Sequence, residues 1–62
     1  MSRLIGEKAV LKAASNWAER TGKDSRIAMA SAQEIMVRLR AKLPPTQYEE
    51  ALRLLHLQYT RY

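Results

Sequence analysis

Two interruptions divide this chain into three segments and limit what it can fold into. The first is the polar stretch at residues 21–24, which contains Gly22, and the second is the adjacent pair Pro44 and Pro45. Gly and Pro are the strongest local markers of turns and helix ends. Between them, apolar residues recur at the three- and four-residue intervals of amphipathic helices. The sequence therefore predicts an all-α chain, a small bundle of three helices at about 3–20, 25–42 and 47–61, in one domain spanning residues 1–62.

The first segment carries an apolar stripe that follows the i, i+3, i+4, i+7 rule. Its members are Val10, Leu11, Ala14, Trp17 and Ala18. Gly22 lies where a left-handed residue commonly closes a helix. The start is open between Ser2 and Glu7, because Leu4 extends the stripe but Gly6 costs about 1 kcal/mol relative to Ala inside a helix.

The second segment begins at Asp24 or Ser25, either of which can cap a helix N-terminus with its side chain. Its predicted core stripe consists of Ala28, Ala32, Ile35, Leu39 and Leu43, with Met29 and Met36 on one flank. An alternative start lies at Ser31, since Ser31 and Glu34 match the capping-box pattern. We favour one continuous helix, because the residues before Ser31 are good helix formers. Pro44 ends it, because the residue before a proline is pushed out of the helical region.

The third segment opens with Thr46 and Glu49, whose spacing matches a capping box. Its predicted core face is an unbroken helical series: Tyr48, Ala51, Leu52, Leu55, Tyr59 and Tyr62. We assign the tyrosines and Trp17 to packing rather than to base stacking, because the tyrosines share this face. The chain holds only two Val and three Ile, with no alternating run of strand length, so we exclude β structure.

A chain of 62 residues without cysteine has little core of its own. Domains of this size bury only about 60% of the surface that the unfolded chain exposes, and no disulfide compensates here. Leu54 and Leu57 lie outside the core face of the third segment, near Glu50 and Arg61. Scattered surface leucines are common, but two on adjacent turns favour a partner or dimer interface formed by Leu54, Leu57 and Arg61. We expect the bundle to complete its core by dimerising through this segment.

The charge balance, eleven Lys and Arg against six Asp and Glu, favours a polyanionic partner. One side of the second segment carries a row of residues without an acid, called here the basic row: Arg26, Ala30, Gln33, Val37 and Arg40. Arg and Gln suit guanine and adenine edges in a major groove, and small apolar side chains suit a thymine methyl. An ordinary solvated face is the alternative interpretation. The candidate nucleic-acid-binding residues are Arg26, Gln33, Val37 and Arg40, with Lys23, Arg38 and Lys42 close in sequence.

Two further details concern the basic side chains. Arg38 and Arg40 belong to one linear cluster but point to different sides of a helix. Lys8 and Lys12 form an i, i+4 pair that can touch phosphates.

Several classes of chemistry are poorly served by this composition. His56 is the only histidine, and Arg53 and Tyr59 lie nearer to it in helical spacing than any acid. Glu49 is about two turns away, so a catalytic or metal-ligating role is not expected. Glycine-rich phosphate loops are absent, since the two glycines are Gly6 and Gly22. We therefore expect no enzyme activity, no cofactor, no metal and no small-molecule substrate. No apolar run reaches the ~20 residues of a membrane span, and we expect a cytoplasmic protein without membrane contact.

Two functions remain in competition. The first is a small nucleic-acid-binding, transcription-regulatory protein that uses the basic row on DNA or RNA. The second is a protein-interaction module, such as a helical inhibitor, adaptor or assembly factor, that uses Leu54 and Leu57 with Met29 and Met36 as adaptable contacts. Size, charge and helical design resemble small regulatory proteins of bacteria, plasmids and phages, and charge places nucleic acid narrowly first.

Overall fold

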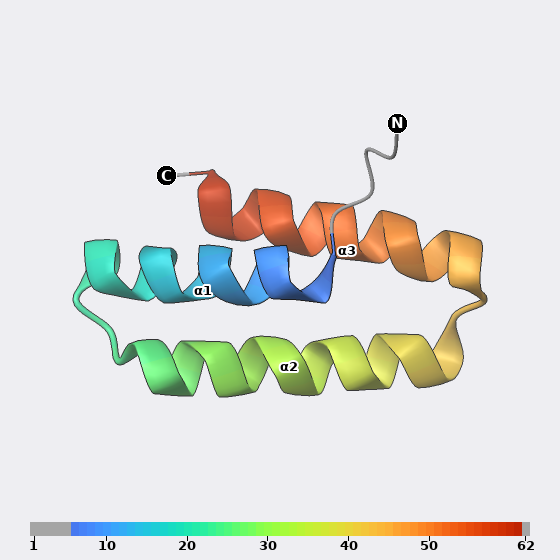
Figure 1. The fold of residues 1–62 in the computed structure, drawn as a ribbon, viewed down its shortest axis with the longest axis horizontal. Helices are drawn as coiled ribbons and strands as arrows, with labels where there is room; N and C mark the ends of the chain where they lie inside the picture. Colours follow the sequence, from blue (N-terminus) through green and yellow to red (C-terminus); the bar gives the residue numbers. More distant parts are fainter. Residues whose placement is uncertain (1–5, 62) are drawn as a thin grey trace.

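The computed structural model describes residues 6–61, and these form three α-helices without a strand (Figure 1). Helix α1 spans Glu7–Thr21, α2 spans Ser25–Lys42 and α3 spans Pro45–Thr60. The predicted all-helical class with three helices is confirmed. Helix α2 runs through Ser31 without a break, as favoured from the sequence. Of the two starts considered for α1, the described chain has the one at Glu7, and residues 1–5 and 62 lie outside it.

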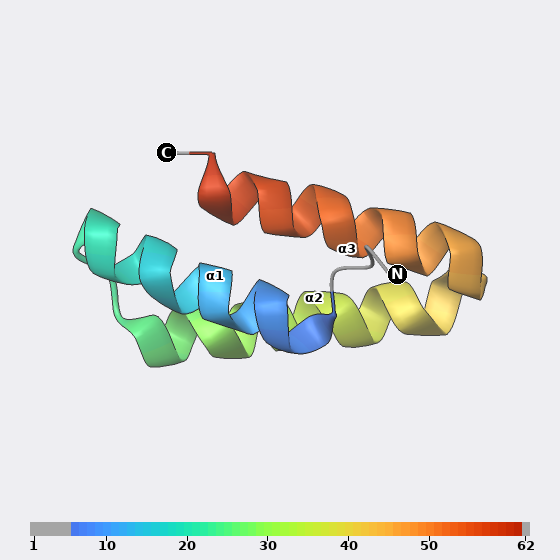
Figure 2. The same cartoon turned by 45° about the horizontal axis from the view of Figure 1, so that its top comes forward.

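Helix α1 lies between the other two helices. It packs along both α2 and α3, which have few contacts with each other (Figures 1 and 2). The molecule is correspondingly thin, with extents of 34 × 26 × 15 Å. Since the side of α3 away from α1 gains little cover from α2, a large part of this helix stays at the surface.

The turn between α1 and α2 is built as the sequence predicts. Gly22 has a left-handed backbone at φ 73°, and the Lys23 amide donates to the Ala18 carbonyl over 2.7 Å. The Asp24 side chain then caps α2 by accepting from the Arg26 amide at 2.8 Å. Both caps satisfy backbone groups that a helix end leaves without intrahelical partners.

The predicted capping box at the start of α3 is wrong. Helix α3 begins at Pro45, one residue before Thr46, and Pro44 occupies the N-cap position without a side-chain cap. The Tyr48 amide donates to the Pro44 carbonyl at 2.9 Å, which is the first helical bond. Proline suits the first helical position, because its fixed φ is helical and its missing amide hydrogen would have no partner there. This preference brings the helix start forward.

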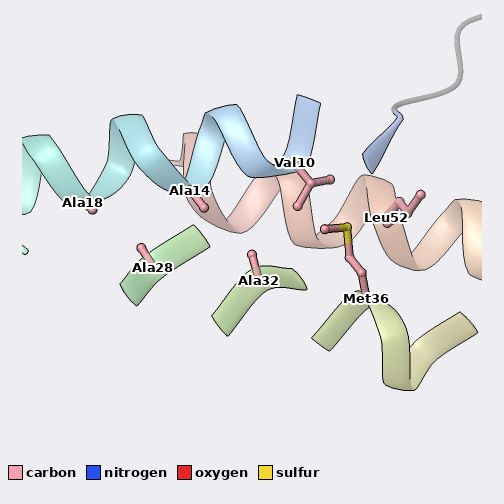
Figure 3. Packing of buried hydrophobic residues seen from close by; sticks show 7 residues of the cluster. All are labelled: Val10, Ala14, Ala18, Ala28, Ala32, Met36 and Leu52. Carbon is pink, nitrogen blue, oxygen red and sulfur yellow. The ribbon is translucent and has the colours of Figure 1, made fainter. Parts of the chain in front are cut away.

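The buried core is small and rich in alanine. Among the described residues, the buried side chains are five alanines with one valine, one methionine and one leucine: Val10, Ala13, Ala14, Ala18, Ala28, Ala32, Met36 and Leu52. Figure 3 shows Ala14 and Ala18 of α1 facing Ala28 and Ala32 of α2. Small side chains of this kind let two helix backbones approach closely, which fits the tight pairing of α1 with α2.

The predicted core stripe of α2 is only partly confirmed. Ala28 and Ala32 are buried, Leu39 and Leu43 are half-buried and lie outside the core cluster, and the placement of Ile35 is wrong. Ile35 is 38% exposed, whereas Met36, which the sequence placed on the flank, is only 3% exposed. The core row is therefore Ala28, Ala32 and Met36, with a spacing of four residues. Packing of the α2 alanines against α1 sets this rotation, because helices meet closest where side chains are smallest. Met36 is consequently unavailable as an adaptable contact for a partner.

Aromatic side chains close one edge of the core. Trp17 and Tyr59 meet edge to face with ring centroids 5.5 Å apart, and both pack against the core cluster. The Arg20 guanidinium donates to the Tyr59 carbonyl at 2.8 Å, which joins the end of α1 to α3. Tyr48 also packs on the cluster, so the packing role assigned to these three aromatics is confirmed, while Tyr62 lies outside the described residues.

Candidate nucleic-acid interface

The basic row lies open to solvent along one side of α2. All five of its residues are exposed, including the apolar Val37 at 62%. The row is separated from the buried Ala28, Ala32 and Met36 by about a third of a turn around the helix. Its side chains are therefore free to meet a partner without disturbing the core.

Helix α1 adds to this surface. Glu7 and Leu11 of α1 line a recess of about 270 Å³ together with Gln33, Val37 and Arg40 of α2. Lys8 and Lys12 are exposed on α1, and each lies next to a recess residue in the sequence. Since α1 and α2 run antiparallel (Figure 1) and share this recess, the first half of α1 lies alongside the second half of the basic row.

An acidic side chain also reaches this surface, and the sequence pattern does not reveal it. The Tyr48 hydroxyl donates a short hydrogen bond to Glu7, and both residues line a second recess with Arg40. Burial, the hydrogen bond to Glu7 and the charge of Glu7 raise the pKa of Tyr48 to about 12, while Arg40 opposes the shift. The row has no acid of its own, but its Arg40 end lies near the Glu7 carboxylate. Sequence separation hides this contact, because it forms only when α1 and α3 pack.

The other candidate basic residues are not gathered on the basic row. Arg38 pairs with Glu34 at 2.8 Å one turn away, and both side chains are exposed. Lys42 is exposed at the end of α2. Around the helix axis, Arg38 lies about a third of a turn from the centre of the row and Lys42 nearly half a turn. Lys23 lies in the α1–α2 turn with its ammonium 5.8 Å from the centre of the Trp17 ring. The structure therefore does not gather Lys23, Arg38 and Lys42 with the basic row on one surface.

Of the three candidate interface residues, Leu54 and Leu57 lie on α3, and Arg61 is the C-cap residue directly after its end at Thr60. Leu54 and Leu57 are 59% and 56% exposed, in agreement with their expected position outside the core face. Both line a largely apolar groove of about 470 Å³ whose other lining residues come from α2 and α3: Leu39, Ala51, Leu55, Gln58 and Arg61. The groove is a property of the folded chain, because Leu39 reaches it from another helix.

Other kinds of site find little support in the part of the chain that is described. No group of three or more His, Asp or Glu residues in it is placed to hold a metal ion. None of its helices is both long and apolar enough to cross a membrane. His56 is partly buried on α3, and no hydrogen bond from its ring is present among the described contacts. The exposed residues include the cations Arg26 and Arg40, the amide Gln33, and the apolar pair Leu54 and Leu57.

Comparison with known proteins adds no assignment. No protein-family model, no curated protein and no solved structure matches the chain.

Proposed function

We propose that the chain is a small nucleic-acid-binding protein of regulatory type, and that the basic row is its contact surface. The observation that carries the proposal is that Arg26, Gln33, Val37 and Arg40 are all exposed along one side of a continuous helix. Arg26 and Arg40 are separated by about 21 Å at the helical rise of 1.5 Å per residue. The DNA major groove is about 12 Å wide and admits an α-helix, so this exposed side of α2 could lie along it.

Two kinds of contact are expected from this surface. Arg26 and Arg40 can reach guanine edges or phosphates, and Gln33 can pair with an adenine edge. Lys8 and Lys12 supply phosphate contacts from the neighbouring helix α1. Each phosphate neutralised by the protein releases counterions, so affinity must fall as salt rises.

The experiment is a fluorescence-anisotropy titration of a labelled duplex at about 50 mM and about 200 mM salt. Arg26→Ala and Arg40→Ala are each expected to weaken binding about tenfold, within the range for a specific arginine contact. Arg53→Ala is the matched control, because it removes the same charge from an exposed position on α3. The control is expected to change affinity by less than about threefold.

Two results would contradict the proposal. If Arg53→Ala weakens binding as much as the row variants, the protein responds to net charge alone and the basic row has no special role. If the duplex and a single-stranded RNA both fail to bind at about 50 mM salt, nucleic-acid binding is rejected. A pull-down that recovers a second protein in stoichiometric amount, still bound after nuclease treatment, would then favour the protein-interaction module. The exposure of Leu54 and Leu57 supports that alternative.

A further inference from the structure

Helix α3 and its C-cap residue, which has a helical backbone, expose a second row of side chains, called here the leucine seam: Glu50, Leu54, Leu57 and Arg61. Their spacing of four, three and four residues places them within an arc of about 60° on the helix surface. The same spacing alternates between the two inward-facing positions of a coiled-coil heptad. Glu50 and Arg61 have no ion pair within the described part of the chain. The seam is therefore an apolar centre with an unpaired charge at each end.

The seam borders a groove whose lining reaches the buried core. Leu54, Leu57 and Arg61 line the groove of about 470 Å³ that also exposes Leu39 and Leu55. Leu55 packs directly on the buried core cluster. A partner helix lying on the seam would thus extend the core outward instead of covering an isolated patch.

The positions of the two charged residues along the seam favour an antiparallel second copy of the same helix as the partner. Glu50 and Arg61 lie at equal sequence distances from a midpoint between Leu55 and His56, and so do Leu54 and Leu57. Two copies of this helix packed antiparallel about that midpoint place each Glu50 opposite the other copy's Arg61. Leu54 of each copy then meets Leu57 of the other. A parallel arrangement would instead bring like charges together, which is unfavourable.

We propose that a second copy of this chain occupies the leucine seam, forming an antiparallel, two-fold symmetric dimer through α3. A two-fold interface requires one surface to complement itself, and the seam meets this requirement in both shape and charge. Binding to a different protein would not explain why Glu50 and Arg61 share a midpoint with Leu54 and Leu57.

The small core is consistent with this occupant. Among the residues that the structure describes, eight are buried hydrophobics and five of these are alanine. They leave little apolar burial to stabilise a lone monomer.

Charge reversal tests the geometry directly. Sedimentation equilibrium would be measured without nucleic acid for the wild type, Glu50→Arg, Arg61→Glu and the double variant. Each single reversal places two like-charge pairs at the interface and is expected to raise the dimer dissociation constant about tenfold or more. The double variant restores opposite charges and should return to within about threefold of the wild type. Glu49→Arg is the matched control, because Glu49 is exposed but lies off the seam.

A second variant separates assembly from folding. Leu54→Glu changes a side chain that is 59% exposed, so its far-ultraviolet circular dichroism should keep the helical signal while the dimer is lost. A wild-type chain that stays monomeric up to about 0.5 mM would overturn the proposal. A dimer that tolerates both single reversals, or one that the double variant fails to restore, would overturn it equally. Because these measurements contain no nucleic acid, their outcome is independent of the proposed function.

Discussion

Gly22 is the only described residue with a positive φ, at 73°. An added Cβ would meet no atom within 4 Å, so substitution there is limited by backbone conformation and not by space. Gly22→Ala is expected to lower the free energy of unfolding by about 1 kcal/mol, because left-handed backbone is unfavourable for a residue with a Cβ. Urea denaturation measures the change. Gly22→Asn is the control and should lose less, since Asn tolerates this region; equal losses would contradict the explanation.

We expect the folded chain to lose stability at alkaline pH because the pKa of Tyr48 is raised. Its pKa is raised from 10.0 to about 12 by burial and by Glu7, so folding favours the neutral phenol. The resulting stabilisation is complete below the unfolded pKa and is lost as pH rises through the folded pKa, between about 10 and 12. Urea denaturation at a series of pH values across this range should show the free energy of unfolding falling more in the wild type than in Tyr48→Phe.

A second tyrosine provides the control for this titration. Burial also raises the pKa of Tyr59, so Tyr59→Phe should remove a different part of the alkaline effect. Glu7→Gln should leave the Tyr48 hydroxyl an uncharged acceptor and lower the pKa of Tyr48. If Tyr48→Phe has the same pH profile as the wild type, neither burial nor Glu7 raises the pKa of Tyr48 in the folded chain.

At the scale of the helices, the pairing of α1 with α2 depends on small side chains. Ala32 is fully buried in this contact, while Ala41 on the same helix is exposed. Ala32→Leu inserts a larger side chain into a close-packed space and should cost about 1–3 kcal/mol of stability. Ala41→Leu, measured by the same thermal denaturation, should change stability by less than about 0.5 kcal/mol. Similar effects of the two substitutions would mean that α1 and α2 are not packed closely at Ala32.

Helix α2 also depends on its cap. The Asp24 side chain accepts from the Arg26 amide at 2.8 Å, and Asp24→Ala is expected to cost about 1 kcal/mol. Asp24→Asn keeps an acceptor oxygen and should retain most of this stability in urea denaturation. A neutral Asp24→Ala substitution would show that the backbone turn at Gly22 is sufficient to start α2.

The elements could be predicted because their signals are local. Gly22 and Asp24 act within a few residues of their own positions, and the structure confirms both caps. The errors fall where non-local packing or a competing local preference decides. Ile35 and Met36 are neighbours in sequence, and only the close approach of α1 determines which of them is buried. At Thr46 the error was local, since the preference of Pro45 for the first helical position outweighs a capping box.

The candidate surfaces were predictable to a similar extent. Helical spacing alone separates the basic row and the two exposed leucines from the core, and exposure of Val37, Leu54 and Leu57 agrees with it. Helical spacing cannot reveal Glu7 beside Arg40 or Leu39 beside Leu54, because each pair joins residues from two helices. The sequence therefore predicts which side of a helix is exposed, but not which residues of other helices lie beside it.

In the whole molecule, the two proposed surfaces do not compete. The leucine seam lies on the α3 side of the bundle (Figure 1). Leu39, the α2 residue that reaches the groove beside the seam, lies more than a third of a turn around α2 from the basic row. A dimer through α3 would leave both basic rows exposed, with one on each copy. Such a pair would suit a duplex if the rows were separated by about 34 Å, one turn of DNA. The nucleic-acid proposal and the dimer proposal can thus each be tested without the other.

Dimerisation makes a final prediction for the whole molecule. If the second copy binds only the folded chain, association stabilises the native state by mass action, and Tm must rise with chain concentration. The effect should be large here, since the core formed by residues 6–61, with eight buried side chains, gives a lone monomer only a few kcal/mol. Thermal denaturation across a hundredfold range of concentration should therefore shift Tm by several degrees in the wild type and not in Leu54→Glu. A wild-type Tm independent of concentration would mean that the small core is sufficient without a partner.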